Sequence, residues 1–233
     1  MLCNNQRGMA ADSIKPINLA VLLSGAGSTL ANFLECIAAG KLDARISVVV
    51  SSRPGVRGLE IAEAAGIPTR VVSRKKHPDE REFSKIVDAA LDEFPVDLVV
   101  FAGFMSKYFA APKYFGKIIN IHPALIPMFC GRGYYGHHVH EAVLSRGVKV
   151  TGCTVHFVDD EYDHGPIIAQ RAVPVRDDDT PDTLAARVQA EERKLYPQVI
   201  QWFAEGRVTL EHGRAIVKGR DRTEFFRADG ASE

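Results

Sequence analysis

The sequence predicts an α/β protein: a single domain with a mostly parallel, Rossmann-like sheet, helices on both faces and an antiparallel C-terminal portion. Runs of Val, Ile and Leu alternate with amphipathic segments in the first half, which is typical of parallel strands covered on both faces. Beyond residue 148, two longer strand-like segments follow each other across one short loop, which indicates antiparallel pairing. The length of 233 residues, with 46% hydrophobic and 25% charged, suits one domain with a sizeable core.

Each element of the first half is predicted from its own pattern. Short apolar runs predict strands, and apolar residues at helical spacing predict helices, as in Phe83, Val87 and Leu91. Gly66 follows the second helix as its expected C-terminal stop. The expected strands are residues 17–23, 46–50, 69–72, 98–102 and 117–122, and the expected helices are residues 29–39, 56–65 and 79–94.

The second half predicts two long strands at 148–158 and 166–175, a long helix at 181–205 and a small hairpin at 207–217. No internal repeat or interdomain linker is visible. We therefore divide the chain into a disordered or loosely attached tail, residues 1–16, and one domain, residues 17–233. The tail lacks the apolar core of a signal peptide.

Charge and cysteine content narrow the classes of partner. The chain has 29 basic and 29 acidic residues, which argues against nucleic-acid or membrane binding through bulk charge but leaves a local anion site open. The four cysteines show no Cys-x-x-Cys spacing, so reduced thiols and a cytoplasmic location are expected. No run reaches the roughly 18 apolar residues of a membrane span. Small-molecule substrates and a monomer or homodimer are the expectation.

Two short motifs carry candidate chemistry. Asn120 and His122 in Asn-Ile-His-Pro lie two apart at a strand end and so share a face. An amide donor beside an imidazole suits stabilisation of an oxyanion and proton transfer, although a polar pair that caps a loop has the same pattern. Asp163, in Asp-His-Gly-Pro, is placed to orient the histidine and favours catalysis.

A glycine-containing loop, residues 24–29, separates the first expected strand from the first expected helix. Its backbone amides and the helix N-terminus favour an anion. A dinucleotide fingerprint is disfavoured, because Leu30 occupies the position of its third glycine and the second strand ends in two serines. The hydroxyls of Ser28 and Thr29 suit a phosphate monoester, and a plain tight turn with a helix cap remains the alternative.

These motifs together resemble a known family. Ser-Gly-Ala-Gly-Ser at 24–28, Ala-Gly-Phe-Met at 102–105, Asn-Ile-His-Pro at 120–123, Thr-Val-His-Phe-Val at 154–158 and Asp-His-Gly-Pro at 163–166 occur in this order. The set is similar to the phosphoribosylglycinamide formyltransferase family, from about residue 17 to about residue 210. The resemblance implies a formyltransferase fold and transfer of the formyl group of 10-formyltetrahydrofolate to the amine of glycinamide ribonucleotide. It implies a role in de novo purine (IMP) biosynthesis, with the folate as cosubstrate and no metal.

The resemblance also implies roles for particular residues. The catalytic trio is Asn120, His122 and Asp163, with proton transfer through His122 or through a water held by Asp163. The implied ribonucleotide-binding residues are Gly27, Ser28, Thr29, Gln189 and Glu192. The implied folate-binding residues are Arg81, Met105, Ser106, Lys107, Tyr108, Val158, Asp159 and Asp160.

Three departures from the family pattern are visible. Ser106 stands where many members carry Arg, and Thr29 stands where Asn is frequent. The segment 129–140 is longer and richer in glycine than the commonest form of this loop. Its role in closing over substrate and the role of the tail therefore stay open.

The histidines outside the trio are also interpreted from their sequence context. His137, His138 and His140 resemble a metal cluster, but no carboxylate or cysteine has matching spacing, so we favour a solvated helix start. His156 lies in a strand near the expected site and is either a support for the catalytic residues or a satisfied strand histidine.

Other functions remain as alternatives. Another 10-formyltetrahydrofolate-dependent enzyme would share the trio, but a methionyl-tRNA formyltransferase needs a further C-terminal domain with a basic face. A formyltetrahydrofolate hydrolase would carry an extra N-terminal regulatory domain, whereas the first strand here is expected near residue 17. A nucleotide-binding module without catalysis would explain the glycine loop and leave the trio unexplained. A nicotinamide fluorescence titration separates that module from an enzyme.

Overall fold

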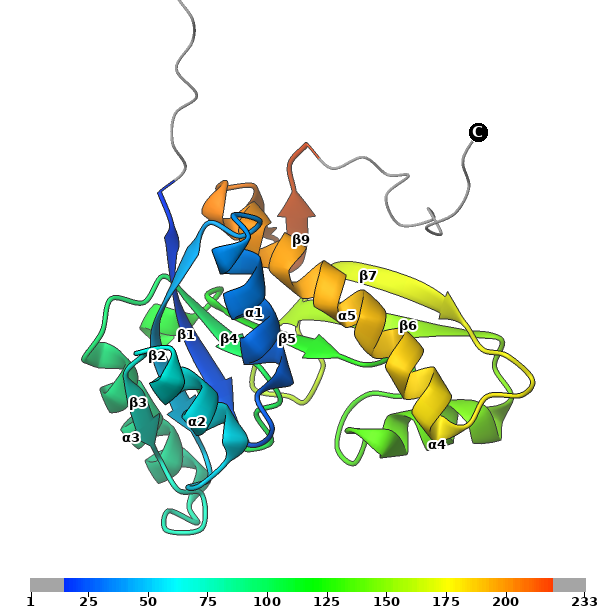
Figure 1. Cartoon of the computed structure of the whole chain (residues 1–233), viewed down its shortest axis with the longest axis horizontal. Helices are drawn as coiled ribbons and strands as arrows, with labels where there is room; N and C mark the ends of the chain where they lie inside the picture. The colour runs from blue at the N-terminus through cyan, green and yellow to red at the C-terminus, as the bar shows by residue number, and fades with distance from the viewer. Residues whose placement is uncertain (1–14, 220–233) are drawn as a thin grey trace, which may run out of the picture.

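A computed structural model describes residues 15–219 of the chain. The expected tail therefore lies almost wholly outside the described residues. Within them, seven strands form one sheet in the order β3-β2-β1-β4-β5-β6-β7 (Figure 1). The strands are β1 (Ile17–Leu23), β2 (Ala44–Ser51), β3 (Thr69–Val71), β4 (Leu98–Phe101), β5 (Ile118–His122), β6 (Val150–Phe157) and β7 (Ile167–Pro174).

The pairing matches the predicted change from parallel to antiparallel strands. Strands β1 to β5 pair in parallel, whereas β6 runs antiparallel to β5, and β7 antiparallel to β6. A separate hairpin of β8 (Val208–Glu211) and β9 (Arg214–Val217) follows the last helix. The predicted single α/β domain with an antiparallel C-terminal portion is confirmed.

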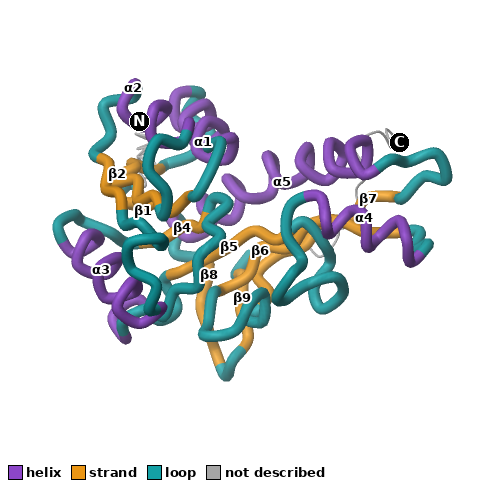
Figure 2. The backbone as a smooth tube through the Cα atoms, turned by 90° about the horizontal axis from the view of Figure 1, so that it is seen from below, coloured by secondary structure: helices purple, strands orange, loops and turns teal. Residues whose placement is uncertain are grey.

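Helices cover both faces of the sheet (Figure 2). One face carries α1 (Ser28–Ala38), α2 (Arg57–Ala64) and α5 (Pro181–Ala204), with α4 (His137–Arg146) packed against α5. The other face carries α3 (Glu80–Asp92). Successive residues of β1 point to opposite faces of the sheet. Leu19, Val21 and Leu23 pack in one core, and Ala20 and Leu22 pack in the other. Burial on both sides explains why the strand is apolar throughout.

Most expected elements lie within two residues of their predicted bounds. A short 3₁₀ helix at Pro112–Tyr114 was not predicted. The N-cap of the long helix α5 is Thr180, which forms a capping box with Thr183. The carboxylate of Asp179, just before it, binds the guanidinium of Arg187. The histidines of α4 begin a helix as predicted, but the expectation that they are all solvated is wrong, because α5 buries His140 to 3% exposure.

The fold brings three chain segments together at the carboxyl end of the sheet. Ser24 follows β1, and its Oγ lies 2.6 Å from the Ser52 hydroxyl, which follows β2. The same Oγ accepts a hydrogen bond of 2.9 Å from the backbone N–H of Met105, which follows β4. Ligands of open α/β sheets bind at this end of the strands, where successive connections diverge to opposite faces.

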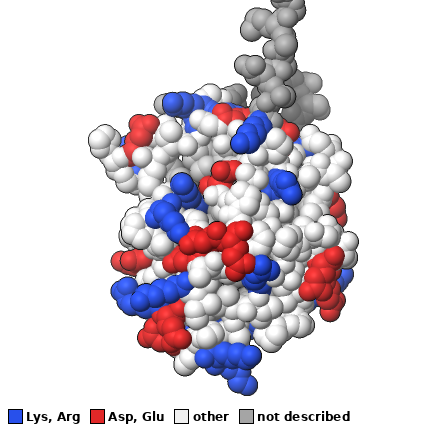
Figure 3. Space-filling model, turned by 90° about the vertical axis from the view of Figure 1, so that its left-hand side faces the viewer, with Lys and Arg blue, Asp and Glu red and all other residues white. Residues whose placement is uncertain are grey.

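Two surface properties bear on the partners. On the face shown in Figure 3, basic and acidic side chains are interspersed and neither sign forms one continuous field. Across residues 15–219, no helix is long and apolar enough to cross a membrane.

Candidate active site

The structure brings Asn120, His122 and Asp163 into one cluster. Asn120 and His122 end β5 on the same face, and Asp163 reaches them from the loop between β6 and β7. Asp163 Oδ1 accepts a hydrogen bond of 3.4 Å from Asn120 Nδ2, and Asp163 Oδ2 lies 3.4 Å from His122 Nδ1. The carboxylate therefore contacts both β5 side chains, as the motif spacing led us to expect.

His122 is buried, and both of its ring nitrogens face oxygen. Nε2 lies 2.7 Å from the backbone carbonyl of Phe129, which can only accept a hydrogen bond. Nδ1 faces the Asp163 carboxylate. An imidazolium, protonated on both nitrogens, donates to both oxygens at once, whereas either neutral tautomer leaves one acceptor without a donor. The two oxygens hold the His122 ring in one orientation within the cluster.

Asp163 is held in a constrained conformation. Its backbone φ is 53°, in the left-handed region that is uncommon for a residue with a side chain. Oδ2 accepts a hydrogen bond of 3.0 Å from the backbone N–H of Gly131. On the same loop, Asp159 Oδ2 lies 2.8 Å from His164 Nδ1. The Gly131 hydrogen bond restrains the Asp163 carboxylate, and the contact between Asp159 and His164 spans the aspartate within its loop.

His156, on β6, lies behind the trio. Its Nε2 is 3.2 Å from Asn120 Nδ2, and its Nδ1 is 2.7 Å from the Phe157 carbonyl oxygen. Burial lowers the pKa of His156, so the neutral ring is favoured. His156 is therefore a strand residue with a hydrogen-bonding partner at each ring nitrogen, and one of these partners is Asn120 of the trio.

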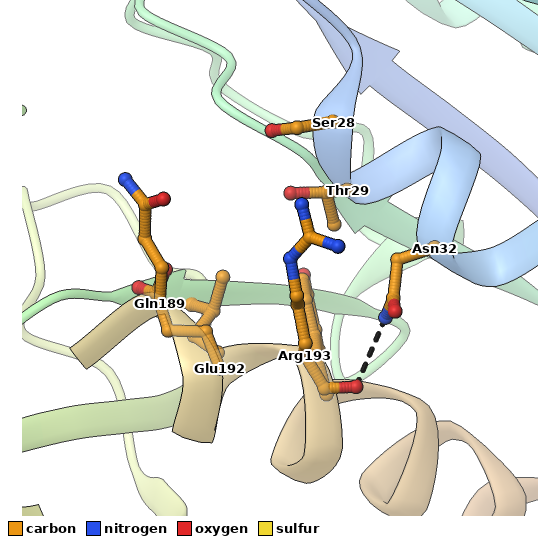
Figure 4. Close-up of a pocket in the computed structure, with 8 residues that line it drawn as sticks. Ser28, Thr29, Asn32, Gln189, Glu192 and Arg193 are labelled. Atoms are coloured by element: carbon orange, nitrogen blue, oxygen red, sulfur yellow. Dashed lines mark hydrogen bonds between the residues drawn. The ribbon is translucent and has the colours of Figure 1, made fainter. Parts of the chain in front are cut away.

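A small cavity of about 80 Å³ lies between α1 and α5 (Figure 4). Its lining includes Ser28, Thr29, Gln189 and Glu192, four of the five residues predicted to bind the ribonucleotide. The fifth, Gly27, precedes α1 with φ of 74°, and α1 begins without a side-chain cap or an acidic residue in its first turn. The first N–H groups of α1 are therefore free to bind an anion.

A larger cavity of about 540 Å³ adjoins the small one. It is lined by all three trio residues, by Met105 and Tyr162, and by Gly136 and His140 of the segment that begins α4. Thr29, Ile121, Gln189 and Glu192 line both cavities, so the two share a wall.

Two ionisable groups on this lining have shifted pKa values. Burial raises the pKa of Glu192 to about 7. Burial, reinforced by the nearby His137 and His122, lowers the pKa of His140 to about 4. The His140 Nδ1 is buried without a hydrogen-bond partner. The cavity lining therefore includes a carboxyl group with a pKa near neutrality and an imidazole that is neutral at that pH.

The comparisons with known proteins identify the family. A family model described as formyl transferase matches residues 17–200. The chain is 37% identical to phosphoribosylglycinamide formyltransferase of Escherichia coli (strain K12) over 207 residues, which cover 88% of this chain and 95% of that protein. The chain belongs to the formyl transferase family. Membership implies a folate-type formyl donor.

Two further relatives extend the comparison. The chain is 44% identical to the human trifunctional purine biosynthetic protein adenosine-3 over 204 residues, 86% of this chain, and it spans about a fifth of that protein's length (20%). The structure of the phosphoribosylglycinamide formyltransferase of Coxiella burnetii superposes with a TM-score of 0.81 at 36% identity, covering 88% of this chain and 95% of that one. The antiparallel addition to a Rossmann-like sheet is thus shared with a solved formyltransferase.

The residues that the family resemblance assigned to a folate pocket are only partly gathered here. Met105 lines the large cavity. Lys107 donates to the backbone carbonyl of Asp160, and its Nζ lies 4.5 Å from the ring centre of Tyr162. Arg81 lies with its guanidinium 4.8 Å from the ring centre of Phe109. Arg81 and Lys107 therefore lie beside the large cavity and do not line it.

The side chain of Tyr108 lies outside the large cavity. Its side chain is 3% exposed, and its hydroxyl donates a 2.5 Å hydrogen bond to Asp88 in the core beneath α3. The Tyr108 side chain therefore does not line the large cavity, and its role in folate binding stays a prediction. Ser106, Val158, Asp159 and Asp160 likewise do not line the large cavity. Val158 packs against the core beneath α3, and the carboxylate of Asp159 faces His164.

Sequence reasoning also missed a residue of the small cavity. Arg193 lines it beside Ser28 and Thr29, and its backbone carbonyl accepts a 2.9 Å hydrogen bond from Asn32 Nδ2. It follows Glu192 directly, and a basic residue there was a visible signal.

Proposed function

We propose that this chain is a phosphoribosylglycinamide formyltransferase, which transfers the formyl group of 10-formyltetrahydrofolate to the amine of glycinamide ribonucleotide in de novo purine biosynthesis. The observation that carries this proposal is that the two cavities adjoin and have four lining residues in common. A free helix N-terminus, suited to a phosphate, adjoins the small cavity, and the trio lines the large one. One substrate with a phosphate at one end and an amine at the other spans this arrangement.

The reaction balances without an oxidant or a reductant. The amine nitrogen bonds to the formyl carbon, the bond from that carbon to the folate nitrogen breaks, and one proton moves from the amine to the departing nitrogen. The tetrahedral stage carries an oxyanion, so donors that are already in place lower its energy. Asn120 Nδ2 and a protonated His122 are such donors, and Asp163 balances the charge of His122. His122 or a water held by Asp163 carries the proton.

The large cavity fits a folate-type cosubstrate, which supplies the formyl group. Met105 and Tyr162 are nearly half exposed on its lining and offer apolar surface to a flat ring system. Arg81 and Lys107 flank Phe109 beside the cavity and suit the carboxylates of a glutamate tail. No step of this chemistry calls for a metal.

A direct assay tests the proposal. Purified protein is incubated with 10-formyltetrahydrofolate and glycinamide ribonucleotide, and loss of the formyl group is followed together with formation of the formylated ribonucleotide. We expect turnover that requires both substrates. Formyl loss without the ribonucleotide would instead indicate a hydrolase. Transfer to methionyl-tRNA with none to the ribonucleotide would indicate a different formyltransferase.

A further inference from the structure

We propose that Arg193 binds the phosphate of the ribonucleotide from α5, while the N-terminus of α1 binds it from the other side. The inference rests on the proposed function for the identity of the substrate. Its physical basis is a cation left without a partner beside a helix N-terminus that is left without a cap.

Arg193 is positioned by the contact between α1 and α5. Its backbone carbonyl accepts the 2.9 Å hydrogen bond from Asn32 Nδ2, and Asn32 is itself 8% exposed on α1. This bond fixes the Arg193 backbone relative to the start of α1. Figure 4 shows the guanidinium extending from α5 toward Thr29, on the side of the cavity where Ser28 also lies.

The guanidinium is free, unlike its neighbours on the same helix. Arg187 forms an ion pair with Asp179, and Lys194 forms one with Glu191. Among residues 15–219, no side chain forms an ion pair or hydrogen bond with the Arg193 guanidinium. A long cationic side chain on a cavity wall without a protein partner suits an anionic ligand.

The charges around the small cavity favour a cation there. A phosphate monoester carries about −1.5 to −2 at neutral pH, whereas a helix N-terminus offers roughly +0.5. Glu192, on the same lining, adds negative charge when it is ionised. Arg193 is the one basic side chain on the described lining of this cavity. Its planar fork can donate two parallel hydrogen bonds to phosphate oxygens.

Ribose 5-phosphate tests this contact independently of formyl transfer. Its binding to the full-length protein is measured by calorimetry in the wild type, Arg193→Met and Arg193→Lys, with Arg214→Met as a matched control on the exposed hairpin. Losing one charge-assisted contact predicts weakening by about ten-fold to a hundred-fold in Arg193→Met. Arg193→Lys keeps the charge but loses the planar guanidinium, so its affinity for ribose 5-phosphate should lie between those of the wild type and Arg193→Met. Arg214→Met should bind like the wild type.

A second measurement isolates the phosphate. In the formyl-transfer assay, Arg193→Met should raise KM for glycinamide ribonucleotide and leave KM for its dephosphorylated ribonucleoside unchanged. Wild-type affinity of Arg193→Met for ribose 5-phosphate would overturn the inference, as would a wild type that does not bind ribose 5-phosphate. If ribose 5-phosphate binding depends on Arg193 but the protein has no formyl-transfer activity, the proposed function is wrong and the phosphate site is still supported.

Discussion

Asn120 and His156 face each other across the antiparallel pair of β5 and β6, with Asn120 Nδ2 3.2 Å from His156 Nε2. His156 Nδ1 faces the carbonyl oxygen of Phe157, which only accepts, so Nδ1 carries the proton of the neutral ring. Nε2 is therefore an acceptor, and the amide nitrogen of Asn120, not its oxygen, must face it. The second amide hydrogen is left for Asp163 or for an oxyanion.

His156 should therefore act as a positioning residue for Asn120. His156→Phe removes the acceptor at Nε2 and lets the amide rotate. We expect kcat to fall by roughly ten-fold to a hundred-fold with little change in KM, because the oriented donor matters most when the oxyanion develops. Steady-state kinetics with His156→Phe and His156→Gln measures this, and the glutamine variant, which keeps an acceptor, should recover part of the rate.

A double-mutant cycle tests the physical link. If His156 acts through Asn120, the variant with both Asn120→Ala and His156→Phe should be little slower than Asn120→Ala alone. Fully additive losses would show that His156 has a separate role.

Asp163→Asn should preserve the fold and reduce turnover. The residue lies in a loop, and the amide keeps the shape of the side chain but removes the charge that faces His122 Nδ1. By analogy with aspartates that orient a catalytic histidine, we expect kcat to fall about a hundred-fold or more, with a shift of the acid limb of the pH–rate profile. Glu161→Gln, on the same loop and exposed, is the matched control and should retain activity. Near-normal turnover of folded Asp163→Asn would mean that the aspartate only caps its loop.

The sequence predicted the order and type of most elements because the sheet is buried on both faces. Every residue of β1 from Leu19 to Leu23 enters a core, so its apolar run is continuous and easily recognised. The shared orientation of Asn120 and His122 could be predicted as well, since residues two apart on a strand lie on the same face.

The directions of side chains on irregular segments could not be predicted in this way. Tyr108 follows β4 on a loop, and only the packing of α3 decides that its hydroxyl reaches Asp88. His140 has the polar sequence context of a surface residue, but α5, more than forty residues later in the chain, buries it. Such burial depends on contacts between distant segments, which local patterns do not contain.

Gly27 and Gly25 offer a matched test of the phosphate loop. A Cβ at Gly27 would lie 2.5 Å from Gly58 Cα, and φ at Gly27 is 74°. Gly27→Ala therefore introduces both a steric clash and an unfavourable backbone conformation. A Cβ at Gly25 would meet nothing within 4 Å. We expect Gly27→Ala to displace the start of α1 and to weaken ribonucleotide binding ten-fold or more, and Gly25→Ala to change it little. Calorimetric titration of both variants measures this, and equal effects would contradict the role of close packing between α1 and α2.

Glu192 should make the protein less stable as the pH rises. Burial raises the pKa of its carboxyl from 4.5 to about 7 in the folded state. Below pH 4.5 the group is protonated in both states and has no effect. Between 4.5 and about 7 the unfolded chain releases the proton while the folded chain retains it, so the free energy of unfolding falls. The total loss is at most ~3 kcal/mol and is constant above that window.

Replacing Glu192 with glutamine should remove this loss. Urea unfolding at several pH values between about 4 and about 8 should show Glu192→Gln more stable than the wild type at the upper end. His140 contributes with the opposite sign, because its pKa is lowered to about 4 and its contribution to stability is lost as the pH falls from 6.5 toward 4. The difference between variants isolates Glu192, since both retain His140. Glu63→Gln, on the exposed face of α2, should follow the wild-type curve. If Glu192→Gln also follows it, the carboxyl is not shielded from water in the folded protein, and the charge balance of the small cavity must be drawn differently.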